Sequence, residues 1–174
     1  MDKVIEGLKE KIKINLKVIY PYEMQINPCI NCKKCQKEKN CTFNDDMNDL
    51  YLEFDETDII LVSTPVFFNG VPAQFKAMID RCQLIWSSKY ILEDSIIDRD
   101  KKRIGYLLAT GGAPEYKDQF CGVQKVMEMF FKAVNAEFKG KQVVANIDKK
   151  PVTERKNILK ESYNIGLRIA EEEF

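Results

Sequence analysis

Four of the six cysteines in this 174-residue chain lie within thirteen residues of one another. They are Cys29, Cys32, Cys35 and Cys41, with the spacing C-x2-C-x2-C-x5-C. Thiolates so close in sequence converge on a shared metal centre or on each other, because a short loop offers them no separate pockets. Iron–sulfur clusters are held by cysteine runs of this general kind, so the stretch is a candidate for redox chemistry.

Two other interpretations of the cysteine run stay open. Structural zinc sites more often use two C-x2-C pairs set well apart, or mixtures of cysteine and histidine. The chain has no histidine, so only an all-cysteine zinc site remains. Alternatively the thiols bind no metal, and either stay reduced or form one redox disulfide.

Composition excludes several function classes. Without histidine, the Ser-His-Asp and Cys-His hydrolase mechanisms are not available. The 27 basic and 27 acidic residues balance, so the chain has no basic footprint for nucleic acid. We find no signal peptide and no apolar run of membrane-spanning length, and clustered thiols fit a reducing compartment. The sequence therefore predicts a cytoplasmic protein with neither a nucleic-acid nor a membrane partner.

The elements that must position these residues alternate between helix and strand. The apolar run at 58–63 predicts a strand buried on both faces of a parallel sheet. Strict alternation predicts one α/β domain over 1–174, an open parallel sheet with helices on both faces. The expected helices cover 1–12, 45–54, 72–86, 120–134 and 151–169, and the expected strands cover 14–20, 58–63, 104–110 and 138–147.

Two loops would lie beyond the carboxyl ends of strands, where ligands bind in such sheets. The first, 64–71, offers apolar walls, and both loops offer small residues that let backbone amides approach a ligand closely. On local chemistry alone, ordinary strand-to-helix turns remain the alternative. The apolar residues are Pro65, Val66, Phe67 and Phe68, and the small or turn-forming ones are Asn69, Gly70, Gly111 and Gly112.

Residues 63–81, S-T-P-V-F-F-N-G-V-P-A-Q-F-K-A-M-I-D-R, resemble the flavin-ring loop and following helix of the flavodoxin-like NAD(P)H-dependent FMN reductases. That pattern is roughly S-P-V-Y/F, a small or polar pair, then a helix ending K-x-x-I-D-R. The cysteine run followed by Asp45-Asp46-Met47 resembles the iron–sulfur flavoprotein branch of the family. Residues 86–90, 110–112 and 130–137 are also similar to that branch, so the resemblance covers nearly the whole chain.

The resemblance implies an FMN-dependent oxidoreductase that takes electrons from NAD(P)H or a ferredoxin-like donor and passes them to a small molecule or redox protein. A four-iron four-sulfur cluster would sit on Cys29, Cys32, Cys35 and Cys41. No catalytic side chain is implied, since the flavin carries the chemistry. It also implies a homodimer or homotetramer. The flavin would be bound by Thr64, Pro65, Val66, Phe67, Phe68, Asn69 and Gly70 on one side, and by Thr110, Gly111 and Gly112 at its pyrimidine end.

One departure from the family pattern affects these expectations. Family members begin with a strand and a G-S-P-R-x-x-G-N-T-like loop that binds the FMN phosphate, whereas this chain begins at the first helix. We therefore expect the sheet to lack the first strand of the family, which is its central one. The natural chain begins further upstream, or the domain is a degraded copy, or the shortened chain has another role. The alternative function is a degenerate flavodoxin-like domain without activity, whose cysteine loop binds a metal or a partner; a zinc-binding interaction module is a third.

Overall fold

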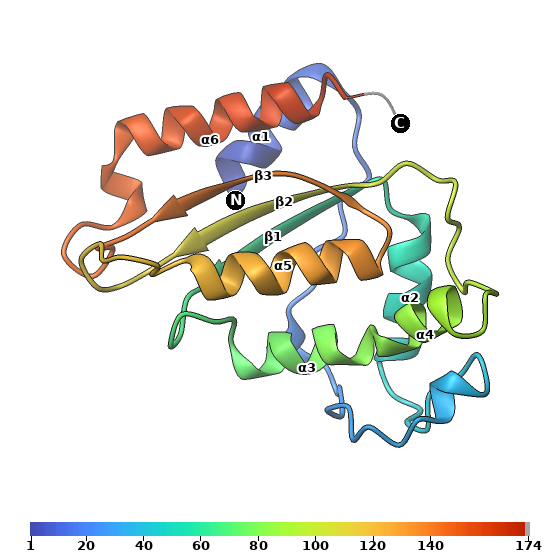
Figure 1. The fold of residues 1–174 in the computed structure, drawn as a ribbon. Helices are drawn as coiled ribbons and strands as arrows, with labels where there is room; N and C mark the ends of the chain where they lie inside the picture. The colour runs from blue at the N-terminus through green and yellow to red at the C-terminus, as the bar shows by residue number, and fades with distance from the viewer. Residues whose placement is uncertain (173–174) are drawn as a thin grey trace.

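Three parallel strands form a sheet in the order β1-β2-β3 in the computed structural model, which describes residues 1–172 (Figure 1). The strands are β1 (Ile59–Pro65), β2 (Ile104–Thr110) and β3 (Glu137–Val144). Pro65 pairs with Thr110, and Thr110 pairs with Val144. The three strands therefore end level, and the loops that follow them share one edge of the sheet.

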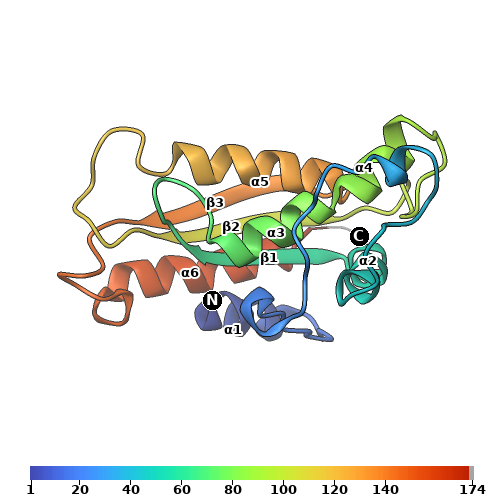
Figure 2. The same cartoon turned by 90° about the horizontal axis from the view of Figure 1, so that it is seen from below.

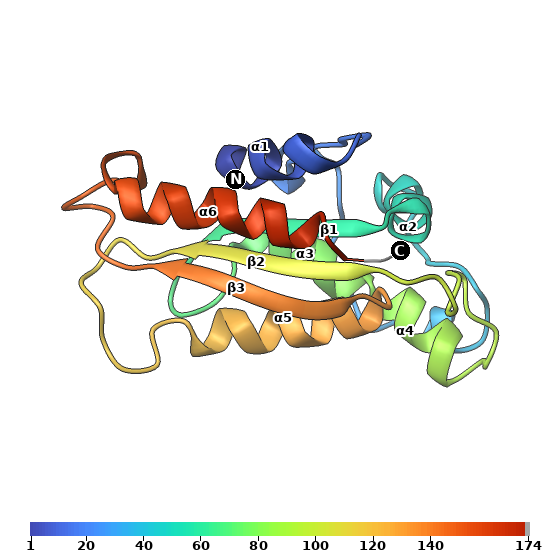
Figure 3. The same ribbon diagram turned by 90° about the horizontal axis from the view of Figure 1, so that it is seen from above.

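Helices cover both faces of this sheet, as Figures 1 and 3 show. One face carries α1 (Asp2–Lys11) and α6 (Lys156–Ile169), and the other carries α3 (Ala73–Arg81), α4 (Gln83–Tyr90) and α5 (Cys121–Ala133). The predicted open parallel α/β sheet is thus confirmed. Helix α2 (Met47–Glu56) lies at the end where the strands begin, and short 3-10 turns cover Pro21–Glu23, Lys34–Gln36 and Val152–Glu154.

The two helices of the first face touch through glycines. A Cβ on Gly7 would lie 2.2 Å from the carbonyl oxygen of Tyr163, and a Cβ on Gly166 would lie 2.1 Å from that of Val4. Only glycine permits such close backbone approach. Beside this crossing, Val4, Leu8, Ile104, Leu108, Ile165 and Ile169 form a small buried cluster.

The larger core fills the space between the sheet and the other helices. Phe131 of α5 packs on Gly105 of β2, where a Cβ would lie 2.4 Å from the ring. Phe130 makes edge-on contacts with Phe54 and Phe75. The apolar faces predicted for the helices around 45–54, 72–86 and 120–134 are therefore confirmed; their buried members include Met47, Leu50, Met78, Ile85, Val123, Met127, Phe130 and Phe131.

The strand predicted over 14–20 is wrong. Among the described residues, the backbone of 13–19 makes no hydrogen bond to other backbone, and Leu16, Val18 and Tyr20 are about half exposed. The segment is not part of the sheet, because alternating apolar residues form a strand only beside another strand. The prediction that β1 is buried on both faces is also wrong: Ser63 and Pro65 are exposed and 59–61 are only half-buried. Within the described chain β1 is an edge strand that pairs with β2 alone.

Other differences concern boundaries. The helix predicted over 72–86 is two helices, α3 and α4, with the break at Cys82, where neither glycine nor proline marks it. Strand β3 ends at Val144, and the last helix begins at Lys156 after a 3-10 turn. No helix in the described part of the chain is both long and apolar enough to cross a membrane.

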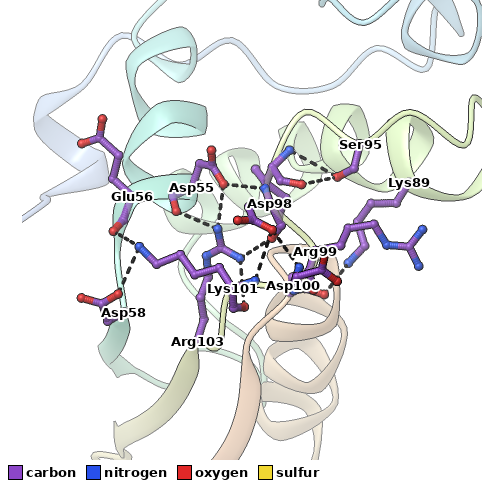
Figure 4. A network of polar contacts seen from close by, with 12 residues as sticks. Asp55, Glu56, Asp58, Lys89, Ser95, Asp98, Arg99, Asp100, Lys101 and Arg103 are labelled. Atoms are coloured by element: carbon purple, nitrogen blue, oxygen red, sulfur yellow. Dashed lines mark hydrogen bonds and ion pairs between the residues drawn. The ribbon is translucent and has the colours of Figure 1, made fainter. Parts of the chain in front are cut away.

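A buried arginine fixes the end of the sheet where the strands begin (Figure 4). Arg103, 2% exposed, donates from Nη2 to the backbone and carboxylate oxygens of Asp55, both at 2.7 Å, and from Nη1 to the carbonyl of Asp98 at 2.6 Å. Asp55 also accepts from the amide of Asp98 at 2.6 Å. This network holds the connection before β2 against the end of α2.

Candidate functional site

The loop after β1 is a tight turn that presents two aromatic side chains. Phe67 and Gly70 exchange backbone hydrogen bonds of 3.1 and 2.9 Å, and the two residues between them have positive φ angles, 50° at Phe68 and 62° at Asn69. Asparagine tolerates this conformation, but it is unusual for a bulky side chain. Phe68 is also fully exposed, with no packing to offset the strain. Such a strained, exposed aromatic indicates a ligand site.

The loop after β2 lies beside this turn, because the amide of Val66 donates to the carbonyl of Thr110 at 2.8 Å. Gly111 and Gly112 follow, and a side chain at either position would displace a neighbouring polar side chain. A Cβ would lie 2.7 Å from Nε2 of Gln119 at the first and 2.4 Å from the Asp148 carboxylate at the second. The amides of Gly112 and Ala113 have no hydrogen-bond partner among the described residues, so both are free donors at this edge.

Sequence reasoning missed three neighbours of these loops. Gln119 is buried and its Oε1 has no partner in the described chain, while its Nε2 donates to the Ala113 carbonyl at 3.4 Å. Asp148 lies in the loop after β3, which joins the site through the amide of Ile147 on the Gly111 carbonyl at 3.2 Å. Tyr116 donates to the side chain of Asn69. Residues 145–150 directly follow the last strand, and this position could have identified Asp148 as a neighbour of the site.

These residues fit the ring system of FMN. The pyrimidine end of isoalloxazine carries two carbonyls, which match the free amide donors of Gly112 and Ala113. Phe67 and Phe68 provide exposed apolar surface for a flat ring. Neither 64–70 nor 110–113 contains a lysine or arginine, so these loops suit the uncharged ring and not the phosphate.

The cysteine loop has a separate site, at the other end of α3 and alongside α4 (Figures 1 and 2). Its base is closed by backbone contacts: the amide of Gln25 donates to the Asp46 carboxylate at 2.8 Å, and the amide of Asn27 donates to Asp45 at 2.9 Å. The 3-10 turn Lys34–Gln36 packs on α4, where Cys35 Sγ lies 3.6 Å from the Ser87 hydroxyl.

The loop thiols form an outer and an inner pair. Cys29 and Cys32 are exposed, whereas Cys35 and Cys41 are half-buried and packed against the core. Within the described residues, no group of three or more cysteine, histidine or acidic side chains is placed to hold a metal ion. The four sulfurs are suitable donors for an iron–sulfur cluster, but this arrangement does not fit one. Outside the loop, burial raises the pKa of Cys82 to about 12, so that thiol is unreactive.

The two predicted sites are therefore not brought together. The aromatic turn precedes the start of α3, and the cysteine loop is bonded to its end. Nine helical residues at 1.5 Å each separate them by roughly 13 Å along the helix axis. The structure brings together Thr64–Gly70 and Thr110–Gly112, as the sequence predicts, and adds Gln119 and Asp148.

Comparison with known proteins gives concordant results. Residues 1–113 match the family model of NADPH-dependent FMN reductases. An iron–sulfur flavoprotein of Archaeoglobus fulgidus is 36% identical over 88 residues, which are 51% of this chain and 42% of the relative. One from Methanosarcina thermophila is 32% identical over 89 residues, 51% and 42% of the two chains. The matched part thus spans about two fifths of these relatives' length.

Solved structures agree on the fold. The FMN-dependent NADH-azoreductase from Bacillus anthracis, in complex with FMN, has a TM-score of 0.71 at 17% identity, covering 98% of this chain and 89% of the other. The NAD(P)H:quinone oxidoreductase from Methanothermobacter marburgensis has a TM-score of 0.69 at 16% identity, covering 99% and 88%. These likenesses confirm the flavodoxin-like architecture. Because this family model matches residues 1–113, well over half of the chain, the chain belongs to the NADPH-dependent FMN reductase family.

Proposed function

We propose that this chain binds FMN at the loops after β1 and β2 and acts as an FMN-dependent oxidoreductase. The observation that carries the proposal is the strained, fully exposed Phe68 beside the free amides of Gly112 and Ala113. Bound FMN supplies the hydride and one-electron chemistry. Family membership supports the same function.

The protein's own residues bind and orient the ring. The amides of Gly112 and Ala113 donate to its carbonyls, and Gln119 holds the second loop in place from beneath Gly111. Phe67 and Phe68 would supply the exposed apolar surface against which the ring packs. No side chain transfers a proton in this proposal, which agrees with the absence of histidine.

The electron donor and acceptor are further parts of the proposal. The names of the azoreductase and quinone oxidoreductase neighbours support NADH or NADPH as donor, and a ferredoxin-like protein is the alternative donor. The acceptor is a small molecule or a redox protein. We also propose a cytoplasmic homodimer or homotetramer, on the resemblance to the family alone.

The cysteine loop is proposed as a second redox or metal site. Its C-x2-C-x2-C-x5-C spacing and the iron–sulfur names of the relatives support a four-iron four-sulfur cluster on Cys29, Cys32, Cys35 and Cys41. Because the sulfurs are not gathered in the structure, such a cluster requires the loop to rearrange. Iron and sulfide analysis after anaerobic reconstitution tests this part separately from FMN binding.

Fluorescence titration of FMN with the purified chain tests the proposed function. We expect saturable quenching by the wild type, and about tenfold weaker binding by Phe68→Ala, a loss of one stacking contact. Leu52→Ala is the control, since Leu52 is an exposed apolar residue of α2, which lies at the opposite end of the sheet from these loops (Figure 1). A wild-type chain that does not quench FMN would contradict the proposal and favour the degenerate domain without activity.

A further inference from the structure

The arginine that ends the K-x-x-I-D-R segment has no role in the proposed FMN site. Arg81 is the last residue of α3, and its side chain is only 1% exposed. A buried arginine requires partners for its charge and its five N–H groups. The identity of those partners indicates what the residue does.

The guanidinium bonds to both ends of the cysteine loop. Nη1 donates to the carbonyl of Asn27 at 2.9 Å and to Asp45 Oδ2 at 2.7 Å, and Nη2 donates to Asp45 Oδ1 at 3.1 Å. Asn27 precedes the first loop cysteine, and Asp45 follows the last. One side chain therefore closes a segment that contains all four thiols.

The surrounding contacts fix this arrangement. Asp45 also accepts from the amide and side chain of Asn27, at 2.9 and 3.1 Å, and from the amide of Met47 at 3.3 Å. The ring of Phe43 lies 5.2 Å from the guanidinium carbon of Arg81. On the other side, the hydroxyl of Tyr51 donates to the Arg81 carbonyl at 2.9 Å, which holds the end of α3.

Stability alone is a weak explanation for this ion pair. Desolvation offsets much of the attraction in a buried pair, and apolar residues of similar volume are often as stabilising. Arg81 also has Nε buried without a partner in the described part of the chain. A guanidinium group can donate directional hydrogen bonds to a carbonyl and a carboxylate at the same time, and an apolar side chain cannot.

We propose that Arg81 is the positioning residue of the cysteine loop: its fork holds Asn27 to Asp45 and so keeps Cys35 and Cys41 against α4 and the core, with Cys29 and Cys32 outside. The inference rests on the proposed function only in one respect, that the cysteine loop is a redox or metal site. It does not depend on FMN, or on which metal, if any, the thiols bind.

Residue-resolved alkylation of the thiols tests this positioning. The reduced, metal-free chain is treated with iodoacetamide, and each cysteine is followed by mass spectrometry, with exposed Cys121 as the reference for the reagent. The variants are Arg81→Met and Asp45→Asn. The matched control is Arg103→Met, which removes another buried arginine that bonds to neither end of the loop. Hydrogen exchange of β2 reports whether each variant is folded.

We expect Cys35 and Cys41 to react about tenfold faster in both test variants, because a charged hydrogen bond contributes about that factor. Cys29 and Cys32, already exposed, should change little, and β2 should stay protected. Arg103→Met should leave the Cys35 and Cys41 rates unchanged relative to Cys121. Unchanged rates in a folded Asp45→Asn or Arg81→Met variant would overturn the proposal. So would equal acceleration by Arg103→Met, or acceleration only together with loss of β2 protection.

Discussion

The amide of Val66 donates to the carbonyl of Thr110 at 2.8 Å, one residue beyond the last paired position of β1 and β2. This single bond places the aromatic turn and the glycine loop at the same point on the edge of the sheet. The candidate flavin site is therefore set by the sheet register.

The loops should recognise the flavin ring and not its phosphate. Because 64–70 and 110–113 contain no basic residue, we expect riboflavin to bind this chain within about tenfold of FMN. Parallel fluorescence titrations of the two ligands measure the ratio. FMN binding more than about a hundredfold tighter would show that a phosphate site elsewhere in the chain dominates affinity.

Substitution of Phe68 should stabilise the folded chain but weaken FMN binding. Its φ angle of 50° is strained for phenylalanine and acceptable for asparagine, and its side chain has no packing to lose. We expect Phe68→Asn to raise the free energy of unfolding by roughly 0.5–1 kcal/mol while weakening FMN binding. Urea denaturation and FMN titration of the same variant measure both effects; a destabilised Phe68→Asn would remove the argument from strain.

Acid should weaken the contact between the cysteine loop and α3. Burial alone would raise the pKa of Asp45, but hydrogen bonds from Arg81 and Asn27 lower it to about 2. A carboxylate with a depressed folded pKa stabilises the protein above its unfolded pKa, near 4, and this stabilisation is lost as pH falls toward 2. We expect a loss on the order of 2 kcal/mol across that window.

Other carboxylates titrate in the same range, so the comparison with Asp45→Asn isolates the contribution of Asp45. Urea unfolding at several pH values between about 4 and 2 gives the two curves. The free energy of the wild type should approach that of the variant as pH falls. Parallel curves would mean that Asp45 is not held ionised by Arg81.

The glycine contact between α1 and α6 should tolerate no side chain. A Cβ on Gly166 would lie 2.1 Å from the backbone carbonyl of Val4, so the helices must separate. We expect Gly166→Ala to lower the free energy of unfolding by about 1–3 kcal/mol, as overpacking does. Gly70→Ala is the control, since its Cβ would meet only ordinary contact at 3.7 Å. Equal stability of the two variants in thermal unfolding would contradict this packing.

The sequence predicted those helices and strands that are determined by the local pattern of apolar residues. The apolar run of β2 identified a buried strand, because β2 has a strand on each side and is buried on both faces. The strand predicted from the alternating apolar residues at 14–20 did not form, because no neighbouring strand pairs with that segment among the described residues. Whether an extended segment joins a sheet depends on a partner distant in sequence.

The candidate sites show the same division. Loops after strands were identified because their position follows from parallel topology. Gln119 was missed, since its closeness to Gly111 depends on the path of the connection between β2 and α5. Arg81 and Asp45 lie thirty-six residues apart, and no periodicity links them. The cysteine spacing indicated shared chemistry, but spacing alone did not predict that two thiols pack inward and two outward.

Amide hydrogen exchange, measured residue by residue by NMR with and without FMN, is the most direct test of the proposed flavin site. We expect the amides of Gly112 and Ala113 to gain protection on FMN addition, together with those of 66–70, while the cysteine loop is unchanged. Saturable FMN binding that protects neither loop would contradict the assignment of the site. An absence of any FMN-dependent change would contradict the proposed function itself.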